Sequence, residues 1–349
     1  MKNKIILPLI IVIALVYGCG KKQQETTLSI SPEAGTSYKQ GQDVAIKLSY
    51  PADLKPDSIV YLIDSARLGS KKDSSAITLK TDTLPLGPRG ITAKLYQGGK
   101  SQDISTNIVL LASKAPEKYT FKVEKVFPHD TSSYTEGLLY QDGYLYESTG
   151  EPGHSTLRKV DLLTGKAVQV AKIDSQYFGE GSAIIGDKIL MLTYKDPRVG
   201  FVFDKKTFKL LKTFPYHVGV EGWGLAFDGK KLYTDDSTNR IWFLDKDNYG
   251  QIGYIDVYDD KGPINSINEL EYIDGKLYAN IWETNDIVVI DPKSGAVLER
   301  VDLTDLYPQN KRTLTADVLN GIAYDAQGKR IFITGKKWPN LYQVKFVKK

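Results

Sequence analysis

A short sequence phrase recurs five times in the C-terminal two-thirds of the chain, and it constrains the fold more than any other feature. Each copy holds an alternating apolar stretch, a turn that contains glycine, and a second short stretch. The copies are EGLLYQDGYLYEST, EGSAIIGDKILMLT, WGLAFDGKKLYTDD, NELEYIDGKLYANI and NGIAYDAQGKRIFIT. Their aligned positions are 44, 43, 45 and 52 residues apart, at Gly137, Gly181, Gly224, Glu269 and Gly321. This spacing is typical of a four-stranded blade and predicts a five-bladed β-propeller.

The two ends of the repeat region predict how the ring closes. The stretch YTFKVEKVF alternates like a strand but precedes the first repeat, whereas the last repeat ends with LYQVKFV and leaves its blade one strand short. The early strand can complete the fifth blade, so that no sheet edge stays exposed. We therefore expect the propeller to span residues 118–349.

The N-terminus has the features of an export signal. Lys2 and Lys4 precede an apolar run over residues 5–16, and the only cysteine, Cys19, follows shortly after. This order predicts a lipoprotein-type signal peptide over residues 1–18, lipidation of Cys19 and a tether over residues 19–27. The bilayer would then be a partner and the cell envelope the location, on the periplasmic face or the outer surface. An ordinary signal or anchor helix with an incidental cysteine is the alternative.

Residues 28–114 show a different pattern. Six short alternating stretches, TLSISP, DVAIKLSY, SIVYLID, SAITLKT, GITAKLYQ and STNIVLLAS, are separated by turn residues. They predict a small immunoglobulin-like β-sandwich. The fold class expected for the whole chain is therefore all-β, with a five-bladed β-propeller preceded by this sandwich. The sandwich has no cluster of His, Cys or carboxylate residues, so a spacer or docking role is expected for it.

Charge and motif content exclude several functions. Lys+Arg number 46 and Asp+Glu 42, with no basic run interleaved with aromatics, so nucleic acid is not an expected partner. Scattered histidines make a zinc hydrolase improbable, and no nucleophile elbow or phosphate-binding loop is present. The acidic pairs Asp235-Asp236 and Glu269/Glu271 leave a structural divalent cation open, although such pairs more often bind backbone amides. We expect no required cofactor, and a monomer.

Two positions in each repeat vary from blade to blade and predict a site. The residues just before the aligned positions are Glu136, Glu180, Trp223, Asn268 and Asn320. The residues that end the second stretches are Gly150, Tyr194, Ser237, Trp282 and Lys336. Hairpin pairing brings both sets to one face, where Tyr134 and Phe178 join them by strand alternation. A merely polar, wet channel mouth is the alternative to a pocket of this kind.

The residue types in this ring suit acid-base chemistry. Glu180 stands among glycines and aromatics, where desolvation raises a carboxyl pKa toward neutrality, and it is the candidate general base or acid. Lys336 and Asn268 could stabilise an oxyanion, and Asn320 could also donate to it. The aromatic residues would hold a small substrate and could contact a cationic amine.

At these residues the chain resembles the plant-type glutaminyl cyclases, from about residue 119 to residue 344. The elements that carry the resemblance are YTEGL at 134–138, FGEG at 178–181, EGWG at 221–224, NELE at 268–271, Trp282, and TGKKWP at 334–339. Two positions depart from the family pattern: Glu136 stands where Gln is usual, and Tyr194 stands where Trp is frequent.

The resemblance implies a glutaminyl-peptide cyclotransferase, which turns N-terminal glutamine of a peptide into pyroglutamate and releases ammonia. It implies catalytic roles for Glu180, Lys336 and Asn268. The implied substrate-binding residues are Tyr134, Glu136, Phe178, Tyr194, Trp223, Trp282 and Asn320. Two alternatives remain: a non-catalytic surface propeller that binds a peptide or glycan, favoured by Glu136, and a metal-dependent, lactonase-like hydrolase.

Overall fold

The computed structural model describes residues 28–195 and 197–349. The predicted signal peptide, the lipidation at Cys19 and the tether lie outside these residues. Within the described ranges the regular structure is almost entirely β, and the one helical segment there is η1 (Gln309–Lys311). No helix in the described part of the chain is long and apolar enough to cross a membrane.

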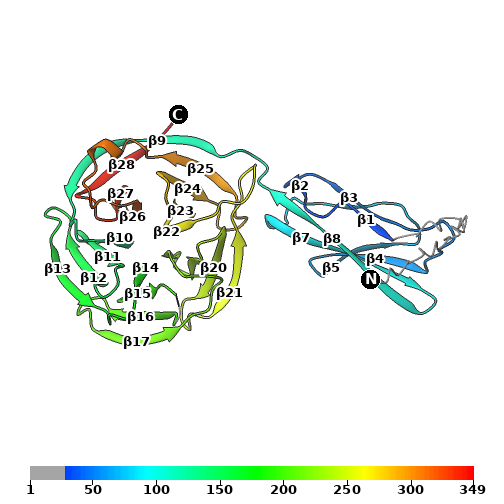
Figure 1. The fold of residues 1–349 in the computed structure, drawn as a ribbon, viewed down its shortest axis with the longest axis horizontal. Helices are drawn as coiled ribbons and strands as arrows, with labels where there is room; N and C mark the ends of the chain where they lie inside the picture. Colours follow the sequence, from blue (N-terminus) through cyan, green and yellow to red (C-terminus); the bar gives the residue numbers. More distant parts are fainter. Residues whose placement is uncertain (1–27, 196) are drawn as a thin grey trace, which may run out of the picture.

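Five blades surround one axis in the C-terminal part (Figure 1). The first is β10 (Thr135–Gln141), β11 (Tyr144–Thr149), β12 (Thr156–Asp161) and β13 (Ala167–Lys172). The second is β14 (Gly179–Ile185), β15 (Lys188–Thr193), β16 (Val199–Asp204) and β17 (Leu210–Pro215). The third is β18 (Leu225–Phe227), β19 (Lys231–Asp235), β20 (Arg240–Asp245) and β21 (Gln251–Asp256). The fourth is β22 (Ile267–Ile273), β23 (Lys276–Ile281), β24 (Asp286–Ile290) and β25 (Val297–Asp302). The predicted propeller is confirmed.

The fifth blade closes the ring with the strand predicted for it. It consists of β26 (Leu319–Asp325), β27 (Arg330–Gly335), β28 (Asn340–Lys348) and the earlier strand β9 (Glu117–Pro128). β9 pairs antiparallel with β28 from Pro128 opposite Asn340 to Tyr119 opposite Lys348. Its first residues also pair in parallel with β25, which links blades four and five. Chain segments from both ends of the propeller therefore share one sheet.

Tight turns between the first two strands bring each inner strand beside its partner. In blade one the turn residues Asp142 and Gly143 have φ of 53° and 86°, and in blade four Asp274 and Gly275 have 46° and 85°. Positive φ at both central residues is the requirement of a two-residue hairpin turn whose twist matches the strands. This turn chemistry explains the recurring Asp-Gly.

Residues before the propeller form two sheets with one shared core. One sheet holds β1 (Ser29–Ser31), β3 (Val44–Ser49) and β6 (Ile77–Leu79); the other holds β2 (Thr36–Lys39), β8 (Lys100–Leu111), β7 (Gly87–Gln97), β4 (Ser58–Ile63) and β5 (Ala66–Lys71). Apolar side chains from both are buried together, among them Ile46, Tyr61 and Ile91. The six predicted stretches became strands; β2 and β5 were not predicted. The immunoglobulin-like topology stays a prediction.

Candidate active site

Local irregularities in the inner strands fix the direction of the ring residues. The strand register shifts between Thr135 and Gly137 in blade one, and between Gly179 and Ser182 in blade two. The same shift occurs between Ile267 and Leu270 in blade four, and between Leu319 and Ile322 in blade five. A β-bulge re-aims a side chain by adding a residue to one strand. The bulged positions are Glu136, Glu180, Asn268 and Asn320.

The bulges also correct the expected pairing. The backbone N–H of Gly150 donates to the Tyr134 carbonyl at 2.8 Å, and that of Tyr194 donates to Phe178 at 2.9 Å. The same bond joins Lys336 to Val318 at 2.9 Å. The residue that ends the second strand is therefore paired two positions before the ring residue, not with it. The bulged residue is thus left free of the ladder to face the axis.

A cavity of about 200 Å³ opens at this end of the ring. Nine of the predicted residues line it: Tyr134, Glu136, Phe178, Glu180, Tyr194, Trp223, Asn268, Trp282 and Lys336. Three other ring residues, Gly150, Ser237 and Asn320, do not line it. Asn320 lies behind the wall, where its Nδ2 donates to the Thr135 carbonyl at 2.9 Å and to Glu136 Oε2 at 3.3 Å. It supports a lining residue instead of lining the cavity.

Aromatic rings form two parts of the cavity wall. The ring of Phe178 lies between those of Tyr134 and Tyr194, with centroids 6.2 and 5.7 Å away. The rings of Trp223 and Trp282 meet edge to face at 5.8 Å. Tilted and edge-to-face pairs are favourable arrangements of aromatic rings, so these contacts stabilise the apolar wall.

A buried ion pair crosses from blade five to blade one inside the cavity. Lys336 Nζ donates to Glu136 Oε1 at 2.7 Å, and both side chains are almost completely buried. The ammonium also lies 4.6 Å from the centre of the Tyr134 ring. Lys336 therefore has a carboxylate partner that the sequence did not suggest. An ammonium has three N–H donors, so Lys336 keeps donors besides the one that binds Glu136.

The two cavity carboxyl groups hold protons more tightly than free glutamate. Burial raises the pKa of Glu136 to about 7, although Lys336 opposes the shift. Burial and the nearby charge of Glu136 raise the pKa of Glu180 well above its usual value. No hydrogen bond among the described residues engages the Glu180 carboxyl, whereas its carbonyl accepts from Ser148 Oγ at 2.6 Å. Glu180 is thus a buried, protonatable group without a fixed partner.

The other buried acids of the inner strands bind backbone amides, as predicted for them. Glu269 accepts from the N–H groups of Leu138 and Ile322 at 3.2 and 2.9 Å. Asp235 accepts from Gly224 N–H at 2.9 Å. Across residues 28–195 and 197–349 no group of three or more His, Cys, Asp or Glu could hold a metal ion. Glu269 thereby links blade four to blades one and five, whereas Asp235 holds the start of β18 against β19 within blade three.

Two acids around the cavity were given no role by the sequence. Tyr134 donates its hydroxyl to Asp317 at 3.2 Å, and Trp223 Nε1 donates to Glu221 at 3.0 Å. Asp317 lies in the long loop before β26 and carries no sequence signal. Glu221 lies in the EGWG element, two residues before Trp223. This spacing could have indicated that the two side chains lie on the same side of the chain and interact.

Fold and cavity together define a class of protein. It is a five-bladed propeller whose axial pocket combines two protonatable carboxyl groups, a lysine and aromatic walls. These groups are suited to acid-base chemistry on a small polar group.

Comparison with known proteins narrows this class. The family model described as glutamine cyclotransferase matches residues 94–346. A curated glutaminyl-peptide cyclotransferase from Arabidopsis thaliana is 39% identical over 224 residues, which is 63% of this chain and 69% of the relative. The crystal structure of Myxococcus xanthus glutaminyl cyclase is 32% identical, with a TM-score of 0.62, covering 67% of this chain and 99% of that one. The chain belongs to the glutamine cyclotransferase family.

Proposed function

We propose that the ring-lined cavity cyclises N-terminal glutamine of peptides, with Glu180 moving the proton between the attacking amine and the departing ammonia. Family membership makes the chain a glutaminyl-peptide cyclotransferase. The observation that carries the mechanism is the position of Glu180, buried in the cavity wall without a hydrogen-bond partner for its carboxyl among the described residues.

The cavity suits the terminal residue of a peptide. Its volume of about 200 Å³ is lined by aromatic rings on two sides, and Trp282 is 39% exposed at the rim. Five-membered ring closure requires the side chain to curl back toward its own α-amine. Holding that conformer between rigid aromatic walls lowers the entropy that the transition state must lose.

Proton transfer follows from the raised pKa of Glu180. A peptide α-amine has a pKa of about 7.7–8.0. Because burial and the Glu136 charge raise the pKa of Glu180 well above its usual value, an amine proton passes to Glu180 at a lower cost than to an ordinary glutamate. The neutral amine nitrogen bonds to the side-chain amide carbon, and the proton that this nitrogen must then lose passes to Glu180. Glu180 delivers that proton to the former amide nitrogen, whose bond to the carbon breaks, and ammonia leaves.

Two further residues would stabilise the oxygen that becomes negative during attack. Lys336 keeps N–H donors beyond the one that Glu136 accepts. The Asn268 side chain lines the cavity, and no hydrogen bond within the described ranges engages its amide. Donors placed in a water-poor cavity favour a developing oxyanion more than they would in water.

An ammonia assay tests the proposed function. The purified protein is incubated with a glutaminyl dipeptide, and with the same peptide acetylated at its N-terminus as the matched control. We expect ammonia only from the free amine, together with a pyroglutamyl product. Folded protein that releases no ammonia from the free peptide would contradict the proposal.

We also propose that acylated Cys19 anchors the chain as a monomer in the cell envelope. The supporting features are the lysines and apolar run before the single cysteine. Detergent phase partition of the full chain and of Cys19→Ser tests this. The proposal predicts that the wild type enters the detergent phase, and it fails if both proteins partition alike.

A further inference from the structure

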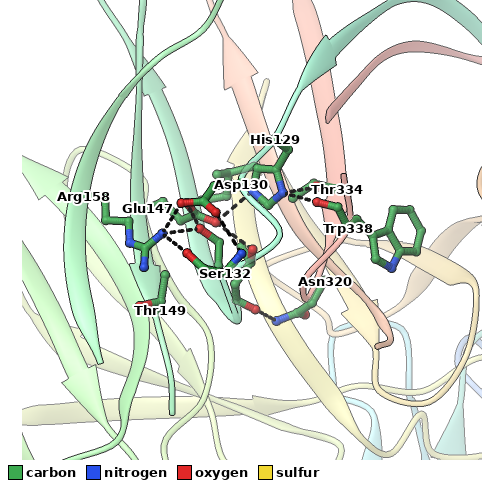
Figure 2. A network of polar contacts seen from close by, with 12 residues as sticks. His129, Asp130, Ser132, Glu147, Thr149, Arg158, Asn320, Thr334 and Trp338 are labelled. Atoms are coloured by element: carbon green, nitrogen blue, oxygen red, sulfur yellow. Dashed lines mark hydrogen bonds and ion pairs between the residues drawn. The ribbon is translucent and has the colours of Figure 1, made fainter. Parts of the chain in front are cut away.

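A buried histidine lies outside the cavity, at the seam where blade five meets blade one. His129 follows directly after β9, and its backbone N–H donates to the Pro339 carbonyl at 2.9 Å. Figure 2 shows its ring between Glu147 of β11 and the chain at Thr334 and Trp338. The ring lines no part of the cavity.

The hydrogen bonds of the ring define its protonation. Nδ1 lies 2.8 Å from the Trp338 carbonyl, which can only accept. Nε2 lies 3.0 Å from Glu147 Oε1. Thr334 Oγ1, 3.4 Å from Nδ1, donates its hydrogen to the Asn340 carbonyl at 2.9 Å. A neutral imidazole has one donor and one acceptor, whereas an imidazolium has two donors. Three acceptors around the ring require the imidazolium, provided that Glu147 is ionised.

The surroundings of Glu147 favour its ionised form. Its Oε1 accepts from Thr135 Oγ1 at 2.7 Å, and its Oε2 accepts from Ser133 Oγ at 2.9 Å. Burial alone would raise the pKa of Glu147, but the charge and hydrogen bond of His129 and the hydrogen bond of Thr135 lower it overall. Both carboxylate oxygens accept from hydroxyl donors in this arrangement. His129 and Glu147 form a buried ion pair with every polar atom bonded, which is the condition under which such a pair is tolerated.

This ion pair joins the two segments that carry the cavity's own ion pair. On one side Glu147 binds Thr135, the residue before Glu136. On the other side His129 holds the Trp338 carbonyl, two residues after Lys336. A backbone bond of 2.7 Å from Lys337 N–H to the Ser133 carbonyl ties the same segments. The distance between Lys336 and Glu136 therefore depends on this seam.

The charged groups facing the histidine set its pH response. Burial alone would lower the pKa of His129, but the charge and hydrogen bond of Glu147, with Asp130, raise it overall. Arg158, which binds Asp130 at 3.1 Å, is the other charge in the cluster. A raised histidine pKa contributes stability that is complete below its ordinary value of about 6.5 and is lost as pH rises through the folded value.

We propose that His129 is a positioning residue for the cyclotransferase site: as an imidazolium it fastens residues 336–339 to blade one and so sets the Lys336–Glu136 pair. The inference rests on the proposed function for its kinetic effect only. Its protonation and its fastening role are properties of the fold. They can be measured even if the protein proves inactive.

Nitrogen-15 NMR of histidine tests the protonation. The chain has 3 histidines, and the other two, His154 and His217, are exposed. We expect the His129 ring to carry both protons at pH 7.5. Glu147→Gln should move the loss of that proton to lower pH. A singly protonated His129 at pH 7 in the wild type would overturn the proposal.

Kinetics test the positioning role. We expect His129→Gln to lower kcat about 10- to 100-fold with little change in KM, because the Lys336–Glu136 pair is displaced. The drop in Tm relative to wild type should shrink as pH rises from 6 to 9. The control Arg240→Gln breaks a bidentate ion pair between β20 and β21, at 2.6 and 3.1 Å. It should lower Tm by a pH-independent amount and leave kcat unchanged.

Two results would contradict this role. Either an unchanged kcat in folded His129→Gln, or a kcat loss that Arg240→Gln reproduces at equal loss of Tm, would reduce His129 to a structural residue. If His129→Gln does not fold, Glu147→Gln takes its place in the same assay. A wild type without cyclotransferase activity would refute the proposed function and leave the NMR and Tm results to decide the fastening role.

Discussion

Two kinds of buried carboxyl group lie in the propeller, and they differ in their hydrogen-bond partners. Glu180 in the cavity and Glu269 in blade four are 4% and 2% exposed, so burial does not distinguish them. Glu269 accepts from two backbone N–H groups of other blades. Within the described residues the Glu180 carboxyl has no hydrogen-bond partner. In the proposed mechanism, the buried acid without a fixed donor is the one available to a substrate.

Glu136 is intermediate between these two cases. It lines the cavity like Glu180, but Lys336 and Asn320 hold both of its oxygens. Its pKa of about 7 lies close to neutrality because the lysine offsets part of the burial cost. Lys336 holds Glu136 in place, and the charge of Glu136 raises the proton affinity of the nearby Glu180 carboxyl.

The largest expected effect is on activity. Glu180→Gln keeps the shape of the side chain but cannot accept the amine proton. We expect kcat/KM in the ammonia assay to fall by about 10²–10⁴-fold. The free energy of unfolding should not fall, because the variant removes the cost of burying an unpaired carboxyl group. Wild-type activity would remove Glu180 from the mechanism.

The next effect is on stability and depends on pH. Lys336→Met leaves Glu136 buried without its cation. Urea unfolding should show a loss of roughly 3–5 kcal/mol where Glu136 is ionised. The loss should be smaller at pH 6, where the carboxyl can hold a proton instead. The exposed pair of Lys348 with Glu117, 2.8 Å apart, supplies the control. Lys348→Met should leave the free energy of unfolding nearly unchanged at either pH, because solvent screens an exposed pair.

Glu269→Gln should show the opposite pattern to Glu180→Gln. One of its two backbone donors loses an acceptor, which costs about 1–3 kcal/mol. Kcat/KM should stay within a few-fold of wild type. Burial raises the pKa of Glu269 to about 8, so the folded state binds the extra proton between about pH 4.5 and 8. Stability from this group is complete below pH 4.5 and falls as pH rises through 8. The free energy of unfolding, measured from pH 5 to 9, should therefore depend less on pH in the variant than in the wild type.

The smallest expected effect is a shift in a pH profile. Glu136→Gln removes a negative charge that raises the pKa of Glu180, while a carboxamide oxygen remains for Lys336. The pKa of Glu180 should fall, so the acid limb of kcat/KM should move to lower pH. Measurement of kcat/KM from pH 5 to 9 decides this. A limb that stays in place would show that the two carboxyl groups do not interact.

The repeat made much of the fold and cavity predictable from sequence. Repeated hairpins place equivalent positions at one end of a ring. Residues as distant in sequence as Tyr134 and Trp282 could therefore be assigned to one cavity. The Lys336–Glu136 pair could not be predicted, because it joins opposite ends of the repeat region across the closing seam. Asn320 was expected in the cavity wall but lies behind it, for a related reason. Its bulged position was recognisable, but the nearby Glu136 that captures its amide was not.

His129 shows a second limit of sequence. Its spacing to the other histidines made a zinc site improbable, and no local pattern indicated another role. Its partners come from two segments distant in sequence, Glu147 of β11 and residues 334–338, which meet only after β9 joins blade five. The surroundings of His129 arise when the propeller ring closes, and no local sequence pattern encodes that closure.

The most direct test of the difference between the two kinds of carboxyl group is an infrared pH titration of their protonated forms. Wild type and Glu180→Gln are compared from pH 5 to 9, with and without a glutaminyl analogue whose side chain cannot cyclise. We predict that wild type shows a protonated-carboxyl signal near neutral pH that Glu180→Gln lacks, and that binding of the analogue changes this signal in wild type alone. If Glu180 titrates at its ordinary pKa, or if the signal survives the substitution, the proposed role of Glu180 is contradicted.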